Sequence, residues 1–161
     1  MQGCDIICLG KLTQNYIAEG CAEYIKRLGG YCNLRVVEIT PVPPAGKTPN
    51  PAAIEKALEG EAKKIFGALR AGSELVALCV EGKGVSSPQL AGILQQNANY
   101  GSGHVTFIIG SSHGLHESVK KACAHRLSFS SMTFPHQLFR LLLLEQIYRA
   151  YTIIAGTPYH K

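Results

Sequence analysis

Two short segments of the chain combine residue types that suit the holding of a small ligand. The first is Gly110-Ser-Ser-His-Gly114, which directly follows the apolar run 105–109. Turns of this kind, at the carboxyl end of a buried strand, present backbone N–H groups to ligands in open α/β sheets. The segment is neither a G-x-G-x-x-G fingerprint nor a Walker A motif. Taken alone, it fits a ligand-binding turn or an ordinary tight turn.

The second segment, Ser128–Phe134, mixes hydroxyl groups with aromatic and thioether side chains. Apolar walls with a few hydrogen-bonding groups suit a ligand of the size of adenine. A polar connector whose two phenylalanines face the core has the same composition. Both interpretations therefore stay open at this point.

Several familiar kinds of catalytic site are disfavoured. Asp5 is the only aspartate and no serine stands in a nucleophile elbow, which argues against a Ser-His-Asp triad. The six cysteines lack the spacing of zinc ligands, so we expect no metal and interpret them as reduced, buried side chains. His113 and His116 lie near the glycine turn, where contact with a ligand and helix capping are equally plausible. His160 is the penultimate residue, and a terminal segment is an unusual place for catalysis because termini fray.

The elements that must position these residues alternate between strand and helix five times. Apolar runs predict strands at 5–9, 34–39, 74–80, 105–109 and 126–128. Amphipathic or capped patterns predict helices at 14–28, 52–69, 88–97, 117–122 and 135–155, the third with Ser87 as N-cap and the last with Pro135 at its first position. This order predicts one α/β domain over residues 1–161, with a mostly parallel sheet and helices on both faces.

Two further segments stand out from this alternation. Residues 41–51 contain five prolines and are predicted to form an exposed loop, to which we assign no function. The last predicted helix contains Leu141–Leu144, four consecutive leucines that cover every side of a helix. A helix on one face of a sheet needs only one apolar stripe. We therefore expect a partner subunit to cover the second face, the alternative being a helix buried within the monomer.

Composition and charge narrow the class of protein. With 46% hydrophobic and 17% charged residues over 161 positions, the chain is predicted to be globular. No apolar run reaches the roughly 18 residues of a membrane span, and residues 1–5 do not resemble a secretory signal, so we expect a cytoplasmic protein without membrane contact. The formal net charge of +5 permits a nucleic-acid partner without requiring one. All of the basic excess lies after Ser118, where six Lys and Arg residues accompany one acid, Glu145.

Three C-terminal motifs carry a resemblance to a known family. They are SFSSMTFPHQLFR at 128–140, EQIYRA at 145–150 and the ending PYHK at 158–161. Together with Gly10-Lys11, EYIKRL at 23–28 and Leu78-x-x-Glu81-Gly-Lys83, they resemble the RlmH family. These are SPOUT-class methyltransferases that act at N3 of a pseudouridine in large-subunit ribosomal RNA. The similarity runs end to end and implies an α/β trefoil knot.

The resemblance also implies a cofactor, partners and site residues. The cofactor would be S-adenosyl-L-methionine, with no metal, and the working unit a homodimer packed through the last helix. The tail of one subunit would reach the other's knot, placing Tyr159 and His160 beside the target base, with His160 as base or orienter. Arg140 would take part in catalysis, either by contacting the RNA or by forming part of the active-site wall. RNA on the assembled ribosome would be contacted by His136, Arg149 and Lys161. The residues that the resemblance assigns to the cofactor are Leu78, Gly110, Phe129, Ser130, Ser131, Met132, Thr133 and Phe134.

Two other functions remain as alternatives: a SPOUT enzyme with another RNA target, or a non-catalytic RNA-binding module. The chain departs from its relatives at three places. Ser111 stands where relatives usually have a glycine, so the backbone there must accommodate a Cβ. His113 is atypical, and the proline-rich segment replaces an acidic stretch.

Overall fold

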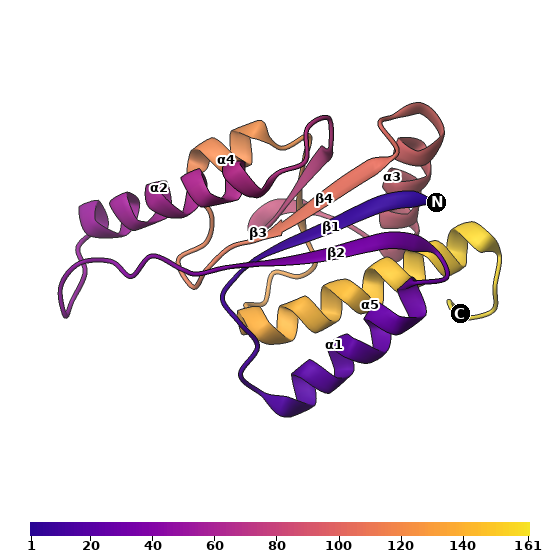
Figure 1. The fold of residues 1–161 in the computed structure, drawn as a ribbon, viewed down its shortest axis with the longest axis horizontal. Coiled ribbons are helices and arrows are strands. Elements are labelled where there is room, and N and C mark those ends of the chain that lie inside the picture. Colours follow the sequence, from indigo (N-terminus) through magenta and orange to yellow (C-terminus); the bar gives the residue numbers. More distant parts are fainter.

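Five strands and five helices alternate along residues 1–161, all of which this computed structural model describes. The strands are β1 (Gln2–Leu9), β2 (Cys32–Ile39), β3 (Glu74–Gly84), β4 (His104–Ile109) and β5 (His125–Ser128). The helices are α1 (Asn15–Leu28), α2 (Pro51–Ala68), α3 (Ser87–Tyr100), α4 (Glu117–Ala122) and α5 (His136–Ala155). The strands form one sheet in the order β2-β1-β4-β3-β5 (Figure 1).

Every neighbouring pair of strands is parallel, which confirms the predicted fold class. The central strands β1 and β4 are buried over Cys4–Leu9 and Val105–Ile109, as expected for strands covered on both faces. The carboxyl ends of β3, β4 and β5 meet at one edge of the sheet, which is where ligands bind in open α/β folds. The trefoil knot implied by the resemblance stays a prediction.

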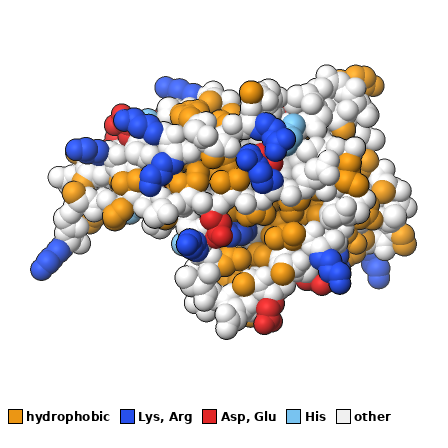
Figure 2. All heavy atoms as spheres, viewed as in Figure 1, with side chains coloured by type: hydrophobic (Ala, Val, Ile, Leu, Met, Phe, Trp, Pro, Cys, Tyr) orange, Lys and Arg blue, Asp and Glu red, His pale blue; other side chains and the backbone are white.

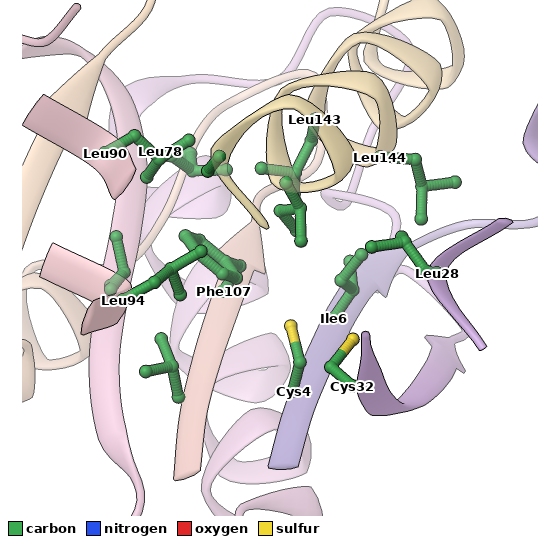
Figure 3. Packing of buried hydrophobic residues seen from close by; sticks show 14 of the residues in the cluster. Cys4, Ile6, Leu28, Cys32, Leu78, Leu90, Leu94, Phe107, Leu143 and Leu144 are labelled. Carbon is green, nitrogen blue, oxygen red and sulfur yellow. The ribbon is translucent and has the colours of Figure 1, made fainter. Parts of the chain in front are cut away.

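Two helical layers cover the sheet, as the alternation of elements predicts. Helices α1, α3 and α5 pack on one face, and α2 and α4 pack on the other (Figure 1). Leu143 and Leu144 extend from α5 into the larger core cluster, which also contains Ile6, Phe107 and Leu28 (Figure 3). All five residues are fully buried, with 0% of their surface exposed, so α5 is anchored firmly to the sheet.

The flanks of α5 are covered more fully than the sequence suggests. Helix α5 lies between α1 and α3. A Cβ added to Gly20 of α1 would lie 3.0 Å from Leu141, so this glycine lets the two helices approach closely. Part of the leucine run is therefore covered within the protomer, by α1 and α3 as well as by the sheet. Leu142 stays half-buried, and a partner subunit stays a prediction.

Three predicted boundaries differ from the structure for local reasons. Ser86, not Ser87, caps α3, because Ser86 and Gln89 form a reciprocal capping box. Pro135 is the N-cap of α5 and not its first helical residue. Strand β3 continues to Gly84 because a bulge after Leu78 lets it resume pairing with β5.

The cysteines behave as core side chains. Four of the six are buried, and Cys79 and Cys123 are partly exposed. Burial raises the pKa of the Cys8 thiol to about 11, so this thiol is protonated at neutral pH. Helices long and apolar enough to cross a membrane are absent from the structure.

Candidate functional site

A cavity of about 760 Å³ lies at the carboxyl ends of β3, β4 and β5. Three segments form most of its wall: residues 78–81 within β3, 109–115 from the end of β4 onward, and 127–136 from the end of β5 onward, of which Ser131 alone does not face it. The glycine turn and the hydroxyl-rich loop, which the sequence identified separately, therefore meet at one site. Their convergence follows from the topology, since β3 is hydrogen-bonded to both β4 and β5.

The glycine turn is too tight to accept a side chain at its first residue. A Cβ on Gly110 would lie 2.5 Å from the carbonyl oxygen of Gly114, which is a clash with backbone. The N–H of Gly114 donates to the Ser111 carbonyl at 2.9 Å, and Gly114 itself has a φ of +84°. Ser111 has no positive φ, so its Cβ is accommodated. The departure at position 111 is thus compatible with the turn.

The loop after β5 holds its own shape through two short hydrogen bonds. The hydroxyl of Ser128 donates to the Ser130 carbonyl at 2.9 Å, and the Met132 N–H donates to the Ser130 hydroxyl at 3.0 Å. Phe129 packs against Phe139 of α5 with ring centroids 5.1 Å apart. The Met132 side chain is 71% exposed. The predicted cofactor residues that line the cavity are Leu78, Gly110, Phe129, Ser130, Met132, Thr133 and Phe134.

Sequence reasoning missed an ion pair in the cavity wall. Lys120 of α4 donates to Glu81, which follows the buried part of β3, and this hydrogen bond lowers the pKa of the Glu81 carboxyl. Glu81 belongs to a quoted motif, but nothing near Lys120 in the sequence indicated a partner 39 residues away.

Arg140 and His136 occupy different positions at the start of α5. His136 lines the cavity, whereas Arg140 is 4% exposed and does not. Arg140 donates to Glu38 at 3.0 Å and to the carbonyl of Gly10 at 2.8 Å. A Cβ on Gly10 would lie 3.6 Å from His136 Nε2. Arg140 therefore fixes the chain that follows β1 directly behind the histidine.

The tail is bound at the other end of α5. Tyr159 donates its phenolic hydrogen to Glu145 at 3.1 Å, and the Tyr24 hydroxyl lies 3.2 Å from the same phenolic oxygen. The Tyr159 ring packs on Tyr148, with centroids 4.9 Å apart, and under the Arg149 guanidinium at 4.7 Å. Burial, followed by the hydrogen bonds to Tyr24 and Glu145, raises the pKa of the Tyr159 phenol. Tyr159 is therefore neutral at ordinary pH.

The tail and the cavity of one protomer are far apart. His160 approaches Arg149, with 3.4 Å between Nδ1 and Nη1, and none of the residues 140, 149 and 159–161 lines the cavity. Helix α5 begins at His136, which lines the cavity, and the tail that follows its other end turns back along the helix (Figure 1). The tail contacts Glu145 and Arg149, which lie roughly 14 to 20 Å along the helix from His136. The structure thus brings together the predicted cofactor residues, and it does not bring the predicted tail residues to them.

Comparison with known proteins adds three kinds of similarity. A family model described as "Predicted SPOUT methyltransferase" matches residues 2–160. Proteins named Ribosomal RNA large subunit methyltransferase H are similar over nearly the whole chain. The one from Pelotomaculum thermopropionicum is 48% identical over 96% of both chains. That from Carboxydothermus hydrogenoformans is 44% identical over 97% of this chain and 98% of the relative.

Among solved structures, a probable methylase family protein from Haemophilus influenzae has a similar fold. Its TM-score is 0.52 at 12% sequence identity, and the match covers 96% of this chain and 67% of that one. At this identity the likeness concerns the fold alone.

Proposed function

Because this chain belongs to the SPOUT methyltransferase family, and within it to the ribosomal RNA large subunit methyltransferase H group, we propose that it methylates N3 of a pseudouridine in large-subunit ribosomal RNA. The observation that carries the proposal is the convergence of the glycine turn and the hydroxyl-rich loop on one cavity of about 760 Å³. The assembled ribosome would be its substrate, which places its work in the cytoplasm.

The volume of the cavity and the residues that line it support S-adenosyl-L-methionine as the ligand. Gly110 lets the turn in the cavity wall close tightly, and Leu78, Phe129 and Phe134 offer an apolar wall to an adenine. Ser130 and Thr133 line the cavity, and the Ser130 hydroxyl, which accepts from the Met132 N–H, keeps its own hydrogen to donate to polar parts of the cofactor. When bound, the cofactor supplies an electrophilic methyl group on a sulfonium and leaves as S-adenosyl-L-homocysteine. No metal is needed for this chemistry.

The protein's own residues then have to orient the target base and accept the proton from its N3. The N3–H of pseudouridine must lose its proton for the nitrogen lone pair to attack. Tyr159 is a poor acceptor because its pKa is raised and its phenol is already a donor to Glu145. His160 is the tail group with an imidazole, which can accept or donate a proton, so we assign it the role of base or orienter. Tyr159 positions the tail and offers an aromatic face for stacking against the target base.

The separation of tail and cavity supports a homodimer with shared sites. The tail contacts Glu145, Tyr148 and Arg149 of α5. These residues lie roughly 14 to 20 Å along the helix from His136, which lines the cavity of the same protomer. Two copies packed through α5 in opposite directions would bring each tail to the partner's cavity. The half-buried Leu142 lies in the middle of this helix, where such an interface would form. Arg140 would act indirectly: its hydrogen bond to the Gly10 carbonyl would hold this segment behind His136 of the cavity wall.

We place the RNA contacts on the basic groups at the two ends of α5. His136 lies at the cavity, and Arg149 and Lys161 lie beside the tail. On the face of Figure 2, Lys and Arg side chains are spread over several elements and do not gather in one patch. Phosphate contacts of this kind weaken steeply as salt rises. Affinity for ribosomes should therefore fall with salt, and a flat response would contradict RNA binding by these groups.

Transfer of a labelled methyl group to ribosomes tests the function. Ribosomes that lack the modification should accept the label at N3 of pseudouridine, and free ribosomal RNA should accept much less. Label on a transfer RNA would favour a SPOUT enzyme with another target. Absence of transfer to every RNA, despite tight binding, would favour a non-catalytic module.

A further inference from the structure

A buried carboxylate lies directly beneath the glycine turn of the cavity. Glu61 of α2 is 3% exposed. Its Oε2 accepts a hydrogen bond from the Ser111 hydroxyl at 2.9 Å, and its Oε1 accepts one from the Val42 N–H at 3.1 Å. It has no ion-pair partner among the salt bridges of the structure. Two neutral donors therefore compensate a charge that is costly to bury.

Ser111 is the point at which a side chain of the turn bonds to the body of the protein. Residues 112–114 are exposed, and Gly110 and Gly114 have no side chain to contribute. The Ser111 carbonyl closes the turn by accepting from the Gly114 N–H, while its hydroxyl reaches Glu61. A bond between the two side chains consequently fixes the turn relative to α2.

The second oxygen of Glu61 extends the connection to the proline-rich segment. Val42 is bound through its N–H, and its side chain packs over Gly60, where a Cβ would lie 3.3 Å from Val42 Cγ2. Lys64, also on α2, donates to the Thr40 carbonyl at 3.0 Å. The first residues of the segment are thus docked on the same turn of α2 that holds the cavity's glycine turn.

We propose that Glu61 is a positioning residue for the cofactor. It holds the glycine turn, through Ser111, in the shape that binds S-adenosyl-L-methionine, and it joins the start of the proline-rich segment to that turn. This inference rests on the proposed function, because it takes the cavity to be the cofactor site. The hydrogen bond from Ser111 to the Glu61 carboxylate is charge-assisted, and such bonds contribute more than neutral ones. Its loss should therefore loosen the glycine turn and lower the affinity for the cofactor.

The test measures the dissociation constant of S-adenosyl-L-methionine by calorimetry, together with thermal unfolding. Ser111→Ala and Glu61→Ala should each weaken binding roughly tenfold, and the double variant should be no weaker than Glu61→Ala. The rate at saturating cofactor should change little. Glu61→Gln should bind within about threefold of wild type, because an amide accepts from Val42 and donates to Ser111. Glu59→Ala, at a 58% exposed side chain of the same helix, is the matched control.

The outcomes separate the inference from the function beneath it. If wild type binds the cofactor and Ser111→Ala binds it equally tightly, the proposed role of Glu61 is overturned and the proposed function still stands. Additive losses in the double variant would also overturn it, because they would mean that the two side chains act independently. Wild-type protein that binds no cofactor would overturn the proposed function itself. Should Glu61→Ala fail to fold, Ser111→Ala and Glu61→Gln still decide the question.

Discussion

The two ends of α5 carry different parts of an enzyme. Its first turns border a cavity walled by glycine turn, apolar side chains and short hydroxyl residues, with His136 at the rim. Its last turns carry a dense cluster of Tyr148, Arg149 and the tail residues Tyr159 and His160, but this cluster lines no part of that cavity. We propose that the first end binds the cofactor, whereas the other end presents polar and aromatic groups.

This difference supports our proposal that one copy of the chain does not hold a complete site. The cavity end offers groups for binding, whereas the tail end offers the groups suited to proton transfer and stacking. Along α5, the contacts of the tail with Glu145 and Arg149 lie roughly 14 to 20 Å from His136 at the cavity. Because α5 is anchored in the core by Leu143 and Leu144, which are 0% exposed, the ends do not approach one another within a protomer. The two functions should therefore respond separately to mutation.

Removal of residues 159–161 should have the largest effect on turnover. Without Tyr159 and His160, methyl transfer should fall by at least about 1000-fold, because both positioning and proton transfer are lost. Cofactor affinity should stay within about twofold, since none of these residues lines the cavity. Tyr100→Ala, at a side chain 87% exposed on α3, is the control. Unchanged turnover would show that the tail takes no part in methyl transfer.

Gly110→Ala should produce the converse result. The added Cβ would lie 2.5 Å from the Gly114 carbonyl oxygen, so the turn must distort. Cofactor affinity should fall by roughly 100-fold, while the tail cluster and the circular dichroism spectrum stay unchanged. Gly67→Ala on α2, where a Cβ meets nothing within 4 Å, is the matched control. A cofactor dissociation constant equal to that of wild type would show that the turn does not bind the cofactor.

Leu142→Glu should separate the copies without unfolding them. Leu142 is half-buried in the protomer, so a carboxylate there is tolerated in the monomer but would be desolvated in an α5 interface. Sedimentation should detect monomers at micromolar concentrations, and methyl transfer should fall with the dimer population. Tyr100→Glu, which places the same charge on exposed surface, should leave the dimer intact. A Leu142→Glu protein that sediments as a dimer would contradict an interface on this helix.

The smallest effect concerns the proton of Tyr159. Its pKa is raised in the folded state, mainly by burial and then by its hydrogen bonds, so the folded protein retains this proton at pH values at which the unfolded chain loses it. The stabilisation is complete below the unfolded tyrosine pKa of about 10 and declines as pH rises above it. Urea unfolding of wild type and Tyr159→Phe should give curves whose difference shrinks above that pH. A constant difference would mean that the phenol does not titrate differently on folding.

Much of the fold was predictable because it depends on local pattern. Apolar runs identified all five strands and helical periodicity identified all five helices, with errors of a few residues at their ends. The extension of β3 to Gly84 was missed because it depends on pairing with β5 after a bulge. Gly82 permits that approach, since a Cβ there would lie 2.7 Å from the Leu127 carbonyl carbon. No local signal encodes such a contact.

The site was predictable in its parts more than in its arrangement. Both ligand loops were recognisable from residue types after a strand, because glycine and hydroxyl residues act locally. The contacts of Glu61 with Ser111 and of Arg140 with Gly10 join residues 50 and 130 positions apart, and tertiary packing alone decides them. The attachment of the tail to Glu145 and Tyr24 is of the same kind.

Mixing two inactive variants tests most directly whether a site is shared between two copies. Protein lacking residues 159–161 keeps its cavity, and Gly110→Ala keeps its tail. In a randomly mixed population, half of the dimers pair one of each, and each such dimer has one intact cavity served by an intact partner tail. Methyl transfer at limiting cofactor should therefore recover to about a quarter of wild type, with each variant alone at about a hundredth or less. Activity that stays at the level of the separate variants, in a mixture shown to contain mixed dimers, would contradict a shared site.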